Sequence, residues 1–386
     1  PITFTSIYGG EDYDARLEQP GWDKAGFDDA QWKKVLLTGS PLDKLYTEMD
    51  FPVSICDSFD VKKITQLKPG TLMYDFGQNA SGIISLKIKG ERGQTVKLIP
   101  SELITDSGFS NQKAVSEGMS GSYYLTYTLK SDQEEIWRPR FTYYGFRYVQ
   151  VEGASAGDSA GGSLPHIVEL KSMHNRSAAP SNGSFECSND LFNKIFTLIN
   201  WAIKSNMQSI ITDCPHREKL GWLEQDYLMG TSVNYNFNIY HLYKKIIRDI
   251  MDAQTHDGLV PDIAPEYVKF EGGFRDSPEW GSASVILPWL VYHWYGDEEI
   301  IKEAYPMMQR YVAYLKKKSV HSILNYGLGD WYDYGPGAPG DAQLTPKALT
   351  ATAIYYYDVS LLGRMAAMLQ KRQDAEHYTH LAEQIK

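Results

Sequence analysis

The first half of the chain alternates hydrophobic and polar residues with the period of a β-strand. Isoleucine and leucine alternate with serine and lysine over 84–88, the glycine-bounded stretch 90–93 follows, and apolar residues return at 96 and 98. This pattern predicts a β-hairpin. Similar alternation occurs over 123–129 and 146–151. Together these strands predict an antiparallel β-sandwich.

After about Ser188 the hydrophobic period changes to that of a helix. One apolar stripe runs through Phe192, Ile195, Phe196, Ile199 and Ile203, and a second through Ile239, Leu242, Tyr243, Ile246 and Ile250. Further helices are predicted near 218–231, 281–295, 297–318, 347–370 and 374–386. Between them lie long loops rich in Gly, Pro and Asp, at 257–280 and 322–346. Loops of this length usually carry function. The segment 154–163 consists mostly of small residues and suits a surface loop or linker.

Composition narrows the classes of function. The net charge is −10 and Lys and Arg are not clustered, which argues against a nucleic-acid partner. No apolar run has the length of a membrane helix, and the three cysteines lack metal-ligand spacing. The sequence contains no phosphate-binding loop, dinucleotide fingerprint, zinc-protease or serine-hydrolase motif. We therefore expect neither a metal nor a cofactor. Compartment and oligomeric state stay open.

The densest group of polar and aromatic residues lies at 212–226. If a helix begins near Glu218, then Glu218, Trp222 and Asp226 lie on one of its faces together with Gln225. Carboxylates beside an indole suit a pyranose, because the ring covers its apolar face while the carboxylates accept hydroxyl protons. A solvated charged turn explains the same pattern equally well. Gly221 also weakens the case for a continuous helix.

Two later loops combine Asp and Trp with Gly, at 261–281 and 327–335. Glycine lets a backbone approach a ligand closely. The alternative is that each Asp caps a helix or closes a turn. His216 lies within the first cluster, but a single histidine is more often a structural group than a ligand.

Several motifs in one order resemble the bacterial α-L-rhamnosidases of glycoside hydrolase family 78. The matching stretches are 11–16 with 26–32, 74–79, 139–148, 183–188 and the signature Asp213-Cys214-Pro215-His216-Arg217-Glu218-Lys219-Leu220-Gly221-Trp222. The resemblance implies a multidomain protein, all-β and then all-α. Residues 1–50 would end an N-terminal β-domain, 51–180 would form the β-sandwich, and 181–386 would form the first half of an (α/α)6 catalytic barrel, which we expect to be open.

The resemblance also implies a site that binds rhamnose. Glu218 resembles the general acid, Asp213 and Arg217 resemble residues that hold the sugar hydroxyls, and Trp222 resembles an aromatic wall. Further substrate-binding positions are Asp276, Trp280, Trp331 and Asp333. Many members continue Gly-Trp-Thr-Gly-Asp, whereas this chain has Leu223-Glu224-Gln225-Asp226 after the tryptophan. The next acidic ligand is therefore Glu224 or Asp226, with Glu224 preferred.

The implied reaction is hydrolysis of terminal α-L-rhamnose from an oligosaccharide or glycoside, with inversion and without a metal. Inversion needs a second carboxylate roughly 6.5–9.5 Å from the acid. The family places this base in a late Trp-Glu pair, and no such pair follows Trp280. We therefore expect the base beyond Lys386 and no turnover by this chain alone. Two alternatives remain: another (α/α)-barrel carbohydrate enzyme of the unsaturated uronyl hydrolase type, and a sugar-binding protein without activity.

Overall fold

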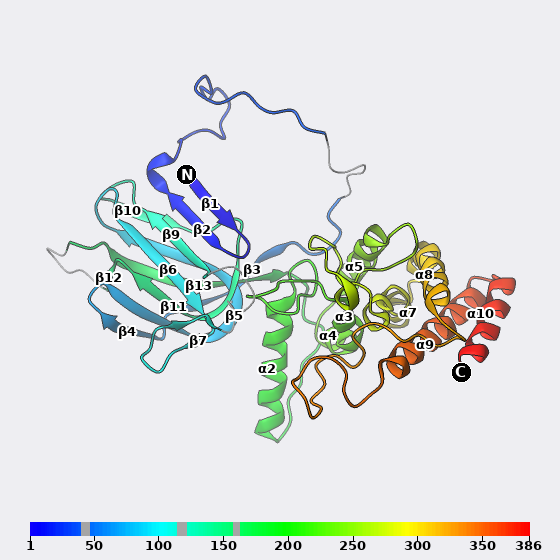
Figure 1. Ribbon diagram of the computed structural model, residues 1–386. Coiled ribbons are helices and arrows are strands. Elements are labelled where there is room, and N and C mark those ends of the chain that lie inside the picture. The colour runs from blue at the N-terminus through cyan, green and yellow to red at the C-terminus, as the bar shows by residue number, and fades with distance from the viewer. Residues whose placement is uncertain (40–46, 114–121, 157–162) are drawn as a thin grey trace. The chain divides into compact units, whose positions relative to one another are not determined.

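The computed structural model describes residues 1–39, 47–113, 122–156 and 163–386, which divide into two compact units. The β unit comprises residues 1–48, 52–176 and 214–217, and the helical unit comprises 49–51, 177–213 and 218–386. Strands, in blue to green, form the first unit, and green to red helices form the second (Figure 1). The predicted order of an all-β part followed by an all-α part is confirmed.

The β unit is built around one long strand, β5 (Thr71–Lys89). The other strands are β1 (Ile2–Ser6), β2 (Gly10–Asp14), β3 (Val53–Asp60), β4 (Lys63–Lys68), β6 (Thr95–Ser101), β7 (Leu103–Ile104), β8 (Ser110–Asn111), β9 (Tyr124–Thr128), β10 (Glu134–Trp137), β11 (Tyr144–Glu152), β12 (Ser155–Ala156) and β13 (His166–Ser177). Hydrogen bonds give the order β1-β2-β9-β6-β11-β5-β13-β12, with β4 and β10 on β5, and β3 on β13. Pairing is parallel for β2 with β9 and for β12 with β13, and it is antiparallel where β5 pairs with β4, β10, β11 and β13.

Alternation correctly predicts the buried face of this unit, but the predicted hairpin is wrong. Ile84, Leu86 and Ile88 of β5 are each at most 1% exposed, and Val96 and Leu98 of β6 are fully buried. However, β6 pairs with β9 and β11, whereas this end of β5 pairs with β13 and β10. The chain does turn after β5, where the amide of residue 94 donates to the carbonyl of residue 91. The turn therefore carries the chain to different partner strands.

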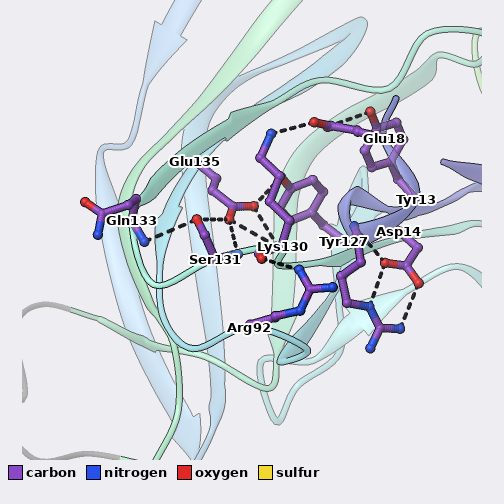
Figure 2. Close-up of polar contacts among 10 residues, drawn as sticks. Tyr13, Asp14, Glu18, Arg92, Tyr127, Lys130, Ser131, Gln133 and Glu135 are labelled. Carbon is purple, nitrogen blue, oxygen red and sulfur yellow. Dashed lines mark hydrogen bonds and ion pairs between the residues drawn. The ribbon is translucent and has the colours of Figure 1, made fainter. Parts of the chain in front are cut away.

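A buried carboxylate ties the strand ends of this unit together. Glu135 is 5% exposed and accepts hydrogen bonds from the Tyr127 hydroxyl at 2.7 Å and from the backbone and hydroxyl of Ser131, both at 2.8 Å (Figure 2). Next to it, Lys130 pairs with Glu18, which also accepts from Tyr13. These partners satisfy the buried charge, as burial requires.

The helical unit contains α2 (Asp190–Asn206), α3 (Leu223–Leu228), α4 (Gly230–Asn236), α5 (Tyr240–Ala253), α6 (Pro278–Gly281), α7 (Ala283–Tyr295), α8 (Glu298–Lys318), α9 (Lys347–Met368) and α10 (Arg372–Ile385). Its core includes the predicted stripe of α5, whose five apolar residues are at most 1% exposed. The predicted stripe of α2 behaves differently. Phe192 is 54% exposed and Ile195 40%, and only Ile203 is buried.

The predicted helix from about Glu218 is wrong in its first turn. Residues 215–218 form a turn, Lys219 has a left-handed φ of 55°, and α3 begins only at Leu223. Instead of continuing a helix, Trp222 pairs with Ile263 in an isolated β-bridge. The one helical face predicted for Glu218, Trp222, Gln225 and Asp226 therefore does not form.

The segment predicted as a loop at 154–163 is only partly described. Ser155 and Ala156 form β12, and 157–162 lie outside the described residues.

Among the residues that are described, no helix is long and apolar enough to cross a bilayer.

Candidate active site

The signature motif forms a closed loop that presents Glu218 to Trp222. The amide of Leu220 donates to Asp213 Oδ1 at 3.0 Å, and the amide of Asp213 donates to the carbonyl of Leu220 at 3.0 Å. At the far side of the loop, the indole Nε1–H of Trp222 donates to Glu218 Oε2 at 2.9 Å. The Glu218 side chain is half-buried. Two of the predicted site residues are thus in direct contact, although they lie on a loop and not on a helix.

An aromatic cluster brings Trp222 and Trp331 to the same phenylalanine. Trp222 stacks on Phe270 with ring centroids 5.3 Å apart, and Phe274 lies 6.5 Å from Trp222 in an edge orientation. Phe274 also contacts Trp331, whose ring centroid is 5.1 Å away and whose plane is nearly perpendicular. Three loops that are distant in sequence therefore meet here, and their rings offer apolar faces suited to a sugar.

Carboxyl groups gather beside these loops. Burial, reinforced by the nearby charges of Glu279 and Asp330, raises the pKa of Glu224 to about 7. Asp330 directly precedes Trp331, so the acidic group adjoins the aromatic cluster. Within the described ranges, no group of three or more His, Cys, Asp and Glu side chains has an arrangement that could hold a metal ion.

Asp262 fixes the loops that carry this acidic group. Asp262 is fully buried, its Oδ1 accepts the Ser277 amide at 2.9 Å, and its carbonyl accepts the Leu223 amide at 2.9 Å. Burial raises its pKa well above the usual range, partly opposed by the Ser277 amide and reinforced by the carboxyls of Asp276, Glu279 and Glu224. A neutral Asp262 therefore joins the start of α3 to the start of α6.

Asp276, predicted to bind a sugar hydroxyl, already has partners on α8. Its Oδ2 accepts the Tyr314 hydroxyl at 2.7 Å and forms an ion pair with Lys318. The Lys318 ammonium also lies over the ring of Tyr326, 3.4 Å from its centroid. These contacts anchor the loop before α6, and they occupy the Asp276 oxygen nearest to α8.

Three other predicted residues are buried. Trp280 is 4% exposed. Asp226 is 2% exposed, and burial, reinforced by Asp249 of α5, raises its pKa well above the usual range. Asp333 is 8% exposed, and its Oδ2 accepts the amides of Gln343 and Leu344 at 2.9 and 2.8 Å. Asp333 thus closes a loop, as the turn alternative anticipated.

The remaining motif residues, Cys214 to Arg217, group with the β unit. There His216 Nε2 lies 2.9 Å from Glu102 Oε2, and Asn79 donates to the other Glu102 oxygen at 2.9 Å. Burial alone would lower the pKa of His216, but the Cys214 thiol and the Glu102 carboxylate beside it raise it to about 9. His216 is therefore a charged structural group.

Sequence analysis did not single out Glu279, Asp262 or Phe274 as site residues. Glu279 lies between Asp276 and Trp280 in a loop that was flagged for its Asp and Trp residues. The one available signal was the acidic content of 261–281, which contains five acidic residues with Glu279 as the last. The role of Glu279 depends on its burial and on its proximity to Glu224, and no local sequence pattern encodes either.

Comparison with known proteins assigns the chain to a family. Residues 180–386 match the bacterial α-L-rhamnosidase six-hairpin glycosidase domain, 65–169 match its concanavalin-like domain, and 1–57 match the α-L-rhamnosidase N-terminal domain. These are domains of carbohydrate-cleaving enzymes. The chain belongs to the bacterial α-L-rhamnosidase family.

Individual relatives agree with the family match. An α-L-rhamnosidase of Streptomyces avermitilis is 33% identical over 100% of this chain and 36% of its own length. The structure of α-L-rhamnosidase from Dictyoglumus thermophilum is 35% identical, with a TM-score of 0.90, over 100% of this chain and 42% of that one. The Streptomyces avermitilis enzyme complexed with L-rhamnose gives a TM-score of 0.85 at 33% identity, over 100% of this chain and 36% of that one. The chain thus spans about two fifths of the length of these relatives.

Proposed function

We propose that this chain carries the sugar pocket and proton donor of an inverting α-L-rhamnosidase, which hydrolyses terminal α-L-rhamnose from an oligosaccharide or glycoside. The observation that carries the proposal is the Trp222–Glu218 hydrogen bond of 2.9 Å. It holds a carboxyl group beside an aromatic cluster, where a sugar ring and its leaving oxygen can both be reached. Family membership and the rhamnose complex of a relative support the substrate.

In the proposed reaction Glu218 gives its proton to the glycosidic oxygen, and a second carboxylate activates water across the ring. Trp222 and Trp331, joined by Phe274, form the apolar wall, and Glu224 accepts or donates hydrogen bonds to sugar hydroxyls. Asp213 and Arg217 are proposed to hold further hydroxyls. We prefer Glu224 to Asp226 as the next acidic ligand, because Glu224 lies near Asp330, beside the aromatic cluster, whereas Asp226 lies near Asp249 of α5.

The proposal extends to the fold. Helices α2 to α10 would belong to an (α/α)6 barrel, and the domains would run over 1–50, 51–180 and 181–386. The family match disfavours the unsaturated uronyl hydrolase alternative. A sugar-binding protein without activity is separated from an enzyme by release of free rhamnose.

The test replaces Glu218 with Gln in the full-length protein and measures rhamnose release from two substrates. Loss of the proton donor should reduce turnover on a poor alkyl leaving group by about 10² to 10⁴, and less on an activated aryl leaving group that needs little protonation. Glu271→Gln, at an exposed position, is the matched control. Equal rates of wild type and Glu218→Gln on both substrates would exclude Glu218 as the acid.

A further inference from the structure

Glu279 is a buried carboxyl group beside the candidate site. It occupies the first turn of α6, is 6% exposed, and neither of its side-chain oxygens has a hydrogen-bond partner in the described part of the chain. Burying a carboxyl group without partners costs stability. A ligand that reaches α6 would supply the hydrogen bonds that these two oxygens lack.

The backbone around Glu279 is nevertheless held firmly. The Tyr227 hydroxyl of α3 donates to the Glu279 carbonyl at 2.8 Å, and the Ser282 hydroxyl donates to the Pro278 carbonyl at 2.6 Å. Because Glu224 lies three residues before Tyr227 on α3, the two side chains share a face of that helix. The Tyr227 contact therefore fixes the face of α3 that carries Glu224 against α6. The Tyr227 contact to the α6 backbone therefore brings the two carboxyl groups together, and not a hydrogen bond between the carboxyl groups themselves.

The charges around this pair favour one proton between the two groups. Glu224 faces Glu279 and Asp330, and burial followed by these two charges raises its pKa to about 7. Burial also raises the pKa of Glu279, against the opposing effects of the Thr350 hydroxyl and the Lys347 charge. Two carboxyl groups in one buried place do not both ionise readily. Near neutral pH the pair therefore has both a hydrogen-bond donor and an acceptor.

We propose that Glu224 and Glu279 form a single hydroxyl-binding subsite, in which one carboxyl donates a hydrogen bond to the sugar and its partner accepts one. This rests on the proposed function, because it assumes that the ligand is the neutral rhamnose ring. Each of two adjacent sugar hydroxyls donates and accepts hydrogen bonds, so they match two carboxyl groups that share one proton. Glu279 is thereby a second specificity-determining carboxylate of the site.

The test measures L-rhamnose binding by calorimetry between about pH 6 and pH 9, in the full-length protein. Wild-type affinity should fall above about pH 7, as Glu224 loses its proton. Glu279→Gln should weaken binding at least about tenfold at pH 6, since an amide cannot accept as a charged oxygen does. It should also move the alkaline decline to lower pH, because Glu224 loses a like-charged neighbour.

Controls separate a binding role from a structural one. Glu279→Asp keeps the carboxyl group and should retain a decline close to that of wild type, while Glu271→Gln should behave as wild type. An alkaline decline that stays at the wild-type pH in Glu279→Gln overturns the shared subsite, even if the melting temperature drops. Binding that requires added Ca²⁺ or disappears with EDTA overturns it too, since the pair would then hold a cation. Absence of rhamnose binding by wild type at every pH overturns the proposed function itself.

Discussion

At the scale of single residues, Glu224 and Asp226 show how two carboxyl groups on one short helix acquire different roles. The two residues are two positions apart on the helix, so their side chains are separated by about 200° around its axis and point to nearly opposite sides. Glu224 faces Glu279 and Asp330, whereas Asp226 faces Asp249 and the core around α5. The sequence left both open as the next acidic ligand, because it does not show which side of α3 faces the core.

Asp226→Asn should stabilise the protein increasingly as the pH rises. The folded state keeps the buried Asp226 proton, whereas the unfolded state loses it above about pH 4. This group therefore reduces wild-type stability as pH rises from about 4 towards its folded-state pKa, by at most about 1.4 kcal/mol per pH unit. An uncharged amide removes that decline. Free energies of unfolding measured in urea at about pH 5, 6, 7 and 8 should diverge between the two proteins.

Asp252→Asn, at an exposed position of the same helix as Asp249, is the control and should run parallel to wild type. Parallel curves for Asp226→Asn as well would mean that Asp226 is charged in the folded state. Rhamnose affinity should be unchanged in Asp226→Asn, because the residue is proposed to lie outside the sugar site.

Glu279 marks the limit of inference from sequence at this scale. The sequence indicated Asp276 and Trp280 as substrate-binding residues. In the structure Trp280 is buried and Asp276 pairs with Lys318. Glu279, which lies between them in the sequence, has two buried oxygens without a hydrogen-bond partner in the described residues. Such a difference arises from contacts with α3, α8 and α9, so it depends on tertiary structure.

At the scale of elements, local periodicity predicted the strands and the longer helices but not their partners. The β5–β6 turn reverses the chain without pairing the two strands, because β11 lies between them in the same sheet. The apolar stripe of α2 predicted its helix correctly, although much of that stripe is exposed. Periodicity reports which face is apolar, and it does not say what covers that face.

The junction between 218–222 and α3 gives an element-scale prediction at Gly221. A Cβ at this position would lie 2.6 Å from the carbonyl oxygen of Ala264, and the same strip of backbone pairs Trp222 with Ile263. Gly221→Ala should therefore push the two segments apart, lower the free energy of unfolding by about 1–3 kcal/mol, and weaken rhamnose binding through displaced Trp222. Urea unfolding and calorimetry measure both effects.

The control for Gly221→Ala is Gly39→Ala, where a Cβ meets no atom within 4 Å. If Gly221→Ala leaves rhamnose affinity at the wild-type value while destabilising the protein, the bridge to Ile263 does not position the sugar wall.

At the scale of the whole molecule, charge selects between a neutral and an acidic sugar. The chain has a net charge of −10, and Glu224 and Glu279 contribute carboxyl groups to the candidate site. The nearby cations Arg275, Lys318 and Lys347 are each paired with a carboxylate. A ligand carboxylate would thus lose its hydration and face like charges, which costs affinity. A neutral ring avoids this cost.

L-Rhamnose should therefore inhibit hydrolysis of an aryl α-L-rhamnoside at least about tenfold more strongly than D-glucuronate at pH 7, a difference of about 1.4 kcal/mol. The preference should narrow at about pH 5.5, where Glu224, with its pKa of about 7, is neutral while the uronate is still charged. It should change little between 0.05 and 0.5 M salt, because buried charges are weakly screened. Inhibition constants at both pH values check this, with D-glucose as a neutral control of similar size. Glucuronate binding as tightly as rhamnose at pH 7 would contradict the neutral-sugar assignment and favour a uronyl hydrolase.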